Sequence, residues 1–175
     1  MQTLEAIHTR RSIRAFTPDP IDEDTLGKLV SAAAAAPSGG NAQNWVFIAI
    51  HDPKRIASIK AIAPGIIGTP TAIIVLCHDT RHRPVHSEAN TDKMIMFDLG
   101  AAMQNILLAA NELGFGGCPI GSFHVGGLRI LLALPESVSP SLLVALGKPK
   151  FRPNILRKRP LSEIYYQEIY EDRDE

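Results

Sequence analysis

The segment 91–113, TDKMIMFDLGAAMQNILLAANEL, constrains the fold of this chain more than any other stretch. It predicts a helix of about six turns that begins at Thr91 and ends before Gly114. A helix that is apolar on nearly all sides must be covered on nearly all sides, so we expect a central position for it. Its principal apolar stripe consists of Ile95, Leu99, Met103, Ile106 and Ala110.

Two arrangements could cover such a helix. Asp98, Gln104 and Asn105 interrupt its apolar surface, which argues against a membrane span. The helix could form the core of a monomer, or it could lie at the interface of a homodimer. The chain has 175 residues, which suits a single domain over 1–175 but is short for wrapping a long helix completely. We therefore favour the homodimer.

The charge and cysteine content exclude several classes of protein. The chain carries 18 Lys and Arg against 18 Asp and Glu, a balance that argues against nucleic acid or an anionic membrane as the main partner. Two cysteines, Cys77 and Cys118, cannot form a disulfide framework. The first 25 residues contain no long apolar run of the kind found in secretory signals. We expect a cytoplasmic protein.

Capping and turn signals divide the chain into helices and strands. Asp22 is placed to cap a helix that Pro37 stops, and Pro53 opens another helix. The mixture predicts an α+β fold in which helices cover a central sheet. We predict helices at 2–9, 22–36, from about 53, and around 128–134, strands at 45–50, 71–77, 117–120 and 142–146, a loop at 78–90, and an extended or helical tail at 161–170.

Two basic segments, 10–14 and 148–160, lie far apart in the sequence. The second contains no acidic residue, whereas the last thirteen residues contain six acids and one Arg. One interpretation is that these runs are solvated surface. The other is that the two segments converge on a small anion such as phosphate, to which arginine can donate two hydrogen bonds. The basic side chains are Arg10, Arg11, Arg14, Lys148, Lys150, Arg152, Arg157, Lys158 and Arg159.

Other patterns are weaker signals. Three histidines recur every four residues, but a proline among them opposes the helix that would align them on a metal. The glycine-rich segment 114–121 follows a helix and opens a strand, the reverse of a dinucleotide-binding fingerprint. Cys118 and His124 could form a thiol dyad, although a cysteine beside proline more often packs than reacts. The histidines are His78, His82 and His86.

Five blocks of sequence, taken in order, resemble the nitroreductase family of flavoenzymes. Each block alone is weak, but their order along nearly the whole chain is specific. In the second block, Asn44 stands where the family usually has Pro. The blocks are RRSIRAF at 10–16, APSGGNAQNW at 36–45, DLGAAMQNILLAA at 98–110, GFGGCPIGS at 114–122 and ALGKP at 145–149.

The resemblance implies a three-layer α/β/α sheet flanked by helices, in a domain-swapped homodimer. The C-terminal segment, about 150–175, would extend onto the partner subunit, and two FMN sites would form at the interface. This agrees with the homodimer inferred from the apolar helix.

The resemblance also implies which residues bind FMN. They are Arg10, Arg11 and Ser12 at the phosphate and ribityl chain, Arg14 near the pyrimidine ring, Pro37, Ser38, Asn41 and Gln43 on a loop from the partner subunit, Pro119, Ile120 and Gly121 under the isoalloxazine ring, and Arg157 and Arg159 as a second phosphate clamp. Lys148 or Lys158 could replace the last two.

The implied activity is that of an FMN-dependent oxidoreductase with a ping-pong mechanism. NADH or NADPH reduces the flavin, and a small organic acceptor (a nitroaromatic, quinone or activated alkene) then takes the electrons. Arg14 would act as an electrostatic stabiliser, and no side-chain acid or base is required because the cofactor carries the chemistry. Alternatives are a non-enzymatic flavin-binding or storage protein, and a family variant that dehalogenates or fragments flavin. Phe123 and His124 are candidate substrate-facing groups, although core packing suits Phe123 better.

Overall fold

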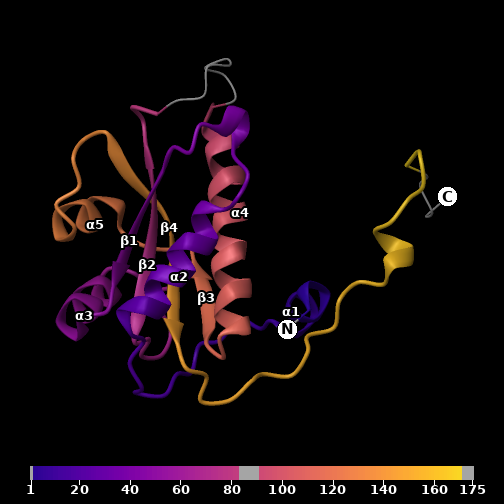
Figure 1. The fold of residues 1–175 in the computed structure, drawn as a ribbon, viewed down its shortest axis with the longest axis horizontal. Coiled ribbons are helices and arrows are strands. Elements are labelled where there is room, and N and C mark those ends of the chain that lie inside the picture. Colours follow the sequence, from indigo (N-terminus) through magenta and orange to yellow (C-terminus); the bar gives the residue numbers. More distant parts are fainter. Residues whose placement is uncertain (1, 83–90, 171–175) are drawn as a thin grey trace.

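The computed structural model describes residues 2–82 and 91–170 (Figure 1). Helices and strands alternate irregularly along the chain, as the capping and turn signals predict. The elements are α1 (Thr3–Thr9), α2 (Glu23–Ala34), the short 3-10 helix η1 (Gly39–Asn41), β1 (Trp45–Ile50), α3 (Pro53–Ala61), β2 (Ala72–Asp79), α4 (Thr91–Glu112), β3 (Gly116–Ile120), α5 (Val125–Leu131), β4 (Val138–Gly147) and the 3-10 helix η3 (Leu161–Glu163).

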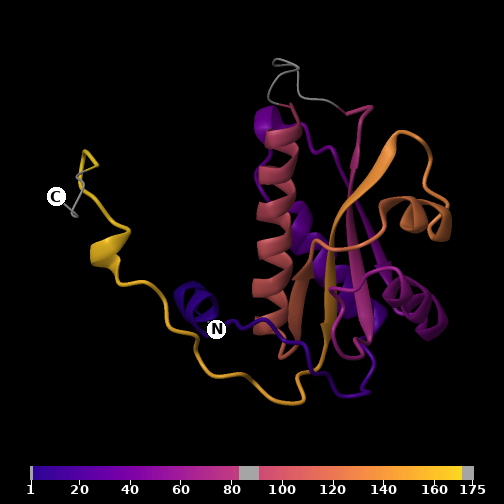
Figure 2. The same cartoon turned by 180° about the vertical axis from the view of Figure 1, so that it is seen from behind.

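The four strands form one antiparallel sheet in the order β1-β2-β4-β3. Strand β2 is apolar on both faces because each face is covered. Ile74 and Leu76 pack with α2 and α4, whereas Ile73 and Val75 pack with α3 and α5. The predicted three-layer α/β/α arrangement is therefore confirmed, and Figure 2 shows α4 on one side of the sheet with α3 and α5 on the other.

Local signals placed most element boundaries within a few residues. The side chain of Asp22 accepts a hydrogen bond from the Thr25 N–H (2.6 Å), which fixes the start of α2. The helix predicted around 128–134 instead begins at Val125, because the Nδ1 atom of His124 accepts from the Gly127 N–H (2.8 Å) and caps it earlier.

The predicted strand at 142–146 was too short. Strand β4 begins at Val138, because Val138 pairs with Asp79 across the sheet and the ladder continues through a bulge to Leu146. The predicted loop at 78–90 was wrong at its start for the same reason, since residues 78 and 79 belong to β2. Residues 83–90 of that loop lie outside the described residues.

Four of the five residues in the predicted stripe of α4 are buried in the core, and the fifth, Met103, is partly buried against it. Leu99 and Ile106 are fully buried and Ile95 nearly so, in a cluster shared with α2 and the sheet. In the described part of the chain, α4 is the one helix long and apolar enough to cross a membrane by length and composition (Lys93–Glu112). One side of it is uncovered in a single chain, because Phe97 is 69% exposed and Met96 is 46% exposed.

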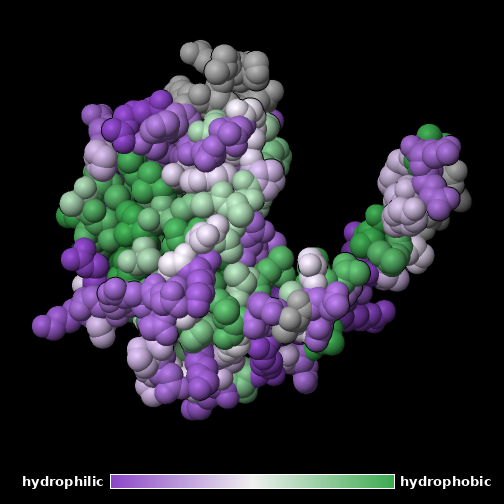
Figure 3. All heavy atoms as spheres, in the orientation of Figure 1, coloured by the Kyte–Doolittle hydropathy of each residue, from purple (hydrophilic) through white to green (hydrophobic). Residues whose placement is uncertain are grey.

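The C-terminal tail leaves the body of the molecule after β4. As far as residue 170, its only regular element is η3, and Figures 1 and 2 show it extending away beyond α1. Figure 3 shows apolar spheres along it, which a solvated tail would not need. Its exposed apolar side chains are Phe151, Ile155, Leu156, Leu161, Ile164, Tyr165, Ile169 and Tyr170.

Candidate functional site

The N-terminal basic segment lies along the edge of the sheet beside β3. Ser12 forms an isolated parallel bridge with Gly117, and the Ile13 N–H donates to the Gly117 carbonyl oxygen (3.0 Å). Ile13 is buried, and adding a Cβ to Gly116 would bring it within 2.3 Å of the Ile13 side chain. Because side chains alternate along an extended segment, Ser12 faces away from the side on which Ile13 is buried.

Arg10 and Arg14 both affect the pKa of Cys118 in β3. Burial raises the pKa of the Cys118 thiol, and Arg14 and Arg10 oppose that shift, Arg14 through a hydrogen bond to the thiol as well as through its charge. Among residues 2–82 and 91–170, neither arginine has an acidic partner. Positive charge is thus concentrated at the Ser12 bridge, as a phosphate site requires.

The side chain of Arg11 hydrogen-bonds to the backbone at the end of α1. Its Nη1 atom donates to the carbonyl oxygens of His8 (2.7 Å) and Arg10 (2.8 Å). These bonds satisfy backbone acceptors at the C-terminal end of α1, a position that favours a cation. The structure therefore places the Arg11 side chain against helix α1.

The start of the second basic segment runs beside the first. The Thr17 N–H donates to the Lys148 carbonyl oxygen (2.9 Å), and the Lys150 N–H donates to the Ala15 carbonyl oxygen (3.0 Å). Lys148 also pairs with Asp19, at 3.6 Å. The structure therefore brings 148–150 to the Arg14 end of the first segment.

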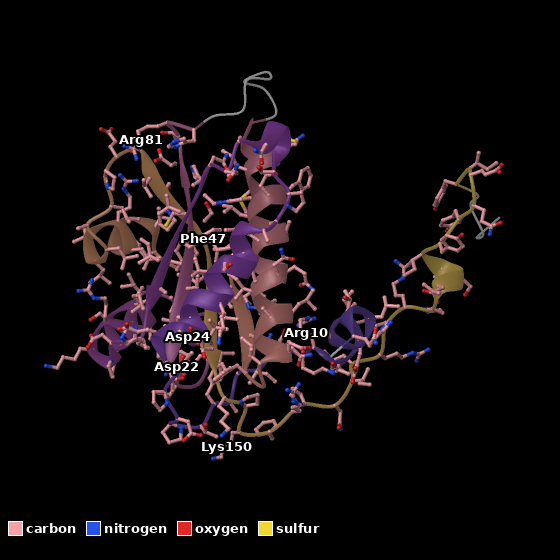
Figure 4. The ribbon with its side chains drawn as sticks, in the orientation of Figure 1. Arg10, Asp22, Asp24, Phe47, Arg81 and Lys150 are labelled. Atoms are coloured by element: carbon pink, nitrogen blue, oxygen red, sulfur yellow. The ribbon has the colours of Figure 1, made fainter. Side chains whose placement is uncertain are left out.

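The predicted second phosphate clamp lies apart from this cluster within one chain. Arg157 and Arg159 are on the tail, and Arg159 pairs with Glu163 (3.1 Å). Figure 4 shows Arg10 beside α1 and the body, while the tail projects away from it.

A buried asparagine, which none of the sequence motifs indicated, connects the tail to helix α1. Asn111, 3% exposed at the end of α4, accepts from Arg152 Nη1 (2.7 Å) and donates to Thr9 Oγ1 (3.0 Å). The signal available was an amide in the last turn of a strongly apolar helix. This network fixes the path of the chain as the tail leaves the body.

The end of β3 presents backbone more than side chains. Ile120 is 4% exposed and its side chain lies in the core with α3 and α5. Gly121 is exposed, with open space where a side chain would be. Pro119 is half-buried. Of the three predicted residues, Ile120 can therefore contact a ligand only through its backbone.

The loop between α2 and β1 carries the other predicted contacts, Pro37, Ser38, Asn41 and Gln43. Its backbone is unusual, since Gly40, Asn41 and Gln43 have φ angles of 58°, 57° and 46°. Two of these residues carry side chains, and positive φ in such residues often marks a functional site. The Ser38 hydroxyl accepts from the Gln43 N–H (3.1 Å), which closes the loop.

The loop between α2 and β1 and the basic segment 10–14 lie toward opposite ends of α4. The loop meets α4 at Asp98, whose carboxylate accepts from the Gly39 N–H, whereas the basic segment begins beside Asn111. These two positions on α4 are about 20 Å apart along the helix axis. Figure 1 shows the corresponding separation, with η1 beside the upper part of α4 and α1 beside its lower end. One chain therefore does not bring the two sets of predicted flavin contacts together.

Other candidate centres do not assemble. Cys118 is 3% exposed and its thiol lies 3.6 Å from the Pro119 carbonyl oxygen, while His124 caps α5. His78 lies in β2 with its Nδ1 atom 2.9 Å from Ser141 Oγ. His82 follows that strand, and His86 lies outside the described residues. Within the described ranges, no group of three or more potential ligands could hold a metal.

Comparison with known proteins identifies the class. The nitroreductase family profile matches residues 7–65 and 58–148. A protein of Archaeoglobus fulgidus that bears the name NADH dehydrogenase/NAD(P)H nitroreductase is 36% identical over 85% of this chain and 86% of its own length. The FMN reductase (NAD(P)H) of Bacillus subtilis is 27% identical over 99% of this chain and 76% of its own. The chain belongs to the nitroreductase family.

A solved structure extends the comparison to three dimensions. The NADPH:FMN oxidoreductase of Vibrio harveyi, in complex with NAD+, superposes with a TM-score of 0.86 at 25% identity. The superposition covers 97% of this chain and 78% of that one.

Proposed function

We propose that this protein is a homodimeric, FMN-dependent oxidoreductase that passes electrons from NAD(P)H to a small organic acceptor. Relatives named for FMN reductase and NADPH:FMN oxidoreductase activity support the reaction class. The observation that carries the proposal is that the expected flavin contacts fall into two half-sites, the basic segment 10–14 and the loop between α2 and β1. These half-sites lie toward opposite ends of α4.

A two-fold axis resolves that separation. If two α4 helices pack antiparallel, the loop of one protomer meets the basic segment of the other, and symmetry produces two identical sites. The uncovered side of α4 supplies apolar surface for this contact, through Met96 and Phe97. The apolar tail would then lie on the second protomer, as the C-terminal segment from about 150 is expected to do.

The residues present fit FMN. Arg10 and Ser12 offer hydrogen-bond donors to a phosphate on the exposed side of the segment, and neighbouring positive charge lacks an acidic partner. The loop offers Ser38, Asn41 and Gln43 from a backbone held in a sparsely populated conformation. Arg157 and Arg159 would add charge from the tail, with Lys158, or Lys148 beside Thr17 and Asp19, as substitutes.

FMN, when bound, would supply hydride acceptance and donation, which no side chain can provide. The task of this chain is therefore to bind, orient and stabilise. Arg14 would stabilise negative charge on the pyrimidine side of the ring without transferring a proton. The exposed backbone at Gly121 would lie close to the ring because no Cβ intervenes. We place the protein in the cytoplasm and leave the acceptor among nitroaromatics, quinones and activated alkenes.

The first test measures the visible absorbance of the purified protein, identifies any released cofactor, and determines the mass of the protein in solution. The purified protein should be yellow, release FMN on denaturation, and elute as a dimer. Anaerobic mixing with NADH or NADPH should bleach the flavin, and a nitroaromatic or quinone should restore its colour. A bound flavin that neither nucleotide reduces would contradict the reductase and favour a storage protein instead.

A further inference from the structure

A buried carboxylate in α4 supports the loop that carries the flavin contacts. Asp98 is 6% exposed, and both of its carboxylate oxygens lie 3.2 Å from the Gly39 nitrogen. The two residues are 59 positions apart, so this bond joins elements that chain connectivity does not. Burial raises the pKa of the Asp98 carboxyl, whereas the bond from Gly39 opposes that shift.

The loop needs such a support. Asn41 and Gln43 both have positive φ, a conformation that side-chain-bearing residues adopt only when their surroundings impose it. Inside the loop, the Asn41 N–H donates to the Ser38 carbonyl oxygen (2.9 Å) and the Gln43 N–H donates to the Ser38 hydroxyl (3.1 Å). These bonds fix the shape of the loop but not its position on the molecule.

The position comes from close contact with α4. A Cβ at Gly39 would lie 2.9 Å from the end of the Met94 side chain, so the loop backbone lies directly on the helix. The Asp98 bond is formed at the same place. A hydrogen bond to an ionised carboxylate is about twice as strong as one between neutral groups.

We infer that Asp98 is a positioning residue for the flavin site: its carboxylate holds the Gly39 N–H and thereby presents Ser38, Asn41 and Gln43 to the cofactor. This inference rests on the proposed function, because the loop has a ligand to meet only if FMN binds. Asp98 itself lies beneath the loop and need not touch the cofactor.

Two substitutions at Asp98 and one control test this assignment in the full-length dimer. Asp98→Ala removes the acceptor, whereas Asp98→Asn keeps an amide oxygen that can accept from the same N–H without charge. Asp24→Asn removes an exposed acid of α2 that pairs with Lys28 and has no bond to the loop. FMN affinity is measured by the quenching of flavin fluorescence, and kcat with NAD(P)H is measured at saturating FMN.

We expect the FMN Kd to rise at least tenfold in Asp98→Ala and no more than fivefold in Asp98→Asn, with no change in the control. At saturating FMN, kcat should stay within twofold of the unmodified enzyme in all three. This split between binding and turnover, with rescue by the amide, is not expected of a residue that only stabilises the fold.

The outcomes separate two failures. If the unmodified protein binds no FMN, the proposed function is wrong. If it binds FMN and Asp98→Ala binds it equally well, the function stands and the positioning assignment is overturned, even if the melting temperature falls.

A variant on the loop covers the case in which Asp98→Ala does not fold. Gly39→Pro deletes the donor N–H, and the extended backbone of Ser38 (φ −138°, ψ 149°) is compatible with a following proline. Position 39 begins a 3-10 turn, where proline is tolerated. Gly39→Ala keeps the N–H and adds the same Cβ against the end of Met94, so it is the control for size. A tenfold weaker FMN affinity in Gly39→Pro than in Gly39→Ala supports the assignment, and equal affinity in the two variants overturns it.

Discussion

Single side chains in the N-terminal segment determine whether this fold can hold a phosphate. Arg10 and Ser12 are half-buried on a strand-like segment that pairs with β3, and replacing them leaves its backbone bonds intact. Losing one hydrogen bond to a charged group costs about 1.5–3 kcal/mol. Arg10→Ala with Ser12→Ala should therefore raise the FMN Kd by about 100-fold or more, as measured by fluorescence titration.

The control pair for that experiment lies on α3. Arg55→Ala with Ser58→Ala removes the same two side-chain types from exposed positions on the other face of the sheet. FMN affinity and melting temperature should both be unchanged there. Equal affinity in the two double variants would show that the phosphate lies elsewhere.

Arg14 should affect the redox chemistry more than it affects binding. Arg14→Gln removes a fixed positive charge while keeping a donor, so the reduced, anionic flavin loses more stabilisation than the oxidised flavin. The midpoint potential should fall by about 30 mV for each tenfold loss of preference for the reduced state. Arg14→Lys should retain much of the potential. Equilibration with reference dyes measures it, and an unchanged potential in Arg14→Gln would remove Arg14 from this role.

The buried Cys77 thiol should make the free energy of unfolding fall at alkaline pH. Burial raises the pKa of the Cys77 thiol from 9.0 to about 12. The folded state thus keeps the proton that the unfolded chain releases above pH 9. The stability contribution is full below pH 9 and is lost progressively as pH rises from 9 toward 12. Urea unfolding between pH 7 and 10.5 should show this fall, and Cys77→Ala should show a shallower one.

At the scale of elements, local capping signals predicted where helices begin, whereas pairing between distant strands decided where β4 begins. Asp22 caps α2 through a bond that the sequence predicts, because the cap and its donor lie three residues apart. Asp52 caps α3 in the same way, beside the Pro53 that marks the start of this helix in the sequence. The start of β4 was missed because Ser139-Pro140-Ser141 has the composition of a turn. Residues 139–141 are extended because they pair with β2, in which Cys77 lies opposite Pro140.

The candidate site also combines residues that the sequence indicates with residues whose contribution depends on long-range packing. Family motifs indicated Arg10, Ser12 and Arg14, and the structure shows that their segment pairs with β3 at Ser12. The contributions of Asp98 and Asn111 could not be predicted, because each depends on which distant loop or helix packs against α4. Arg11 shows the converse case, since the motif marks it and the structure uses it to cap α1.

The Asn111 network should control where the tail leaves the body. Arg152→Ala removes the charged donor to Asn111, and losing a hydrogen bond to a charged group costs about 1.5–3 kcal/mol. We expect a dimer that dissociates about tenfold or more readily, measured by sedimentation velocity over a dilution series. Lys54→Ala, on exposed α3, is the control. A dimer of unchanged affinity would separate the network from assembly.

At the scale of the whole molecule, the proposal makes flavin binding a property of the dimer. Phe97, 69% exposed on the uncovered side of α4, would be buried twice in a two-fold interface. Burying a phenylalanine side chain contributes about 1.5–3 kcal/mol, so Phe97→Glu should weaken dimerisation by about 3–6 kcal/mol. Light scattering should then show monomers at micromolar protein, whereas Ile130→Glu on α5, which is 83% exposed, should leave the dimer intact.

Protein concentration distinguishes lost assembly from a locally damaged site. The Phe97→Glu monomer keeps every residue of both half-sites, yet neither half-site alone holds all the predicted contacts. It should therefore bind FMN weakly at low protein concentration and recover affinity as concentration rises and the dimer re-forms. A monomer that binds FMN at full affinity would show that one chain completes the site. Weak binding at every concentration, with the dimer restored, would assign the loss to the adjacent loop.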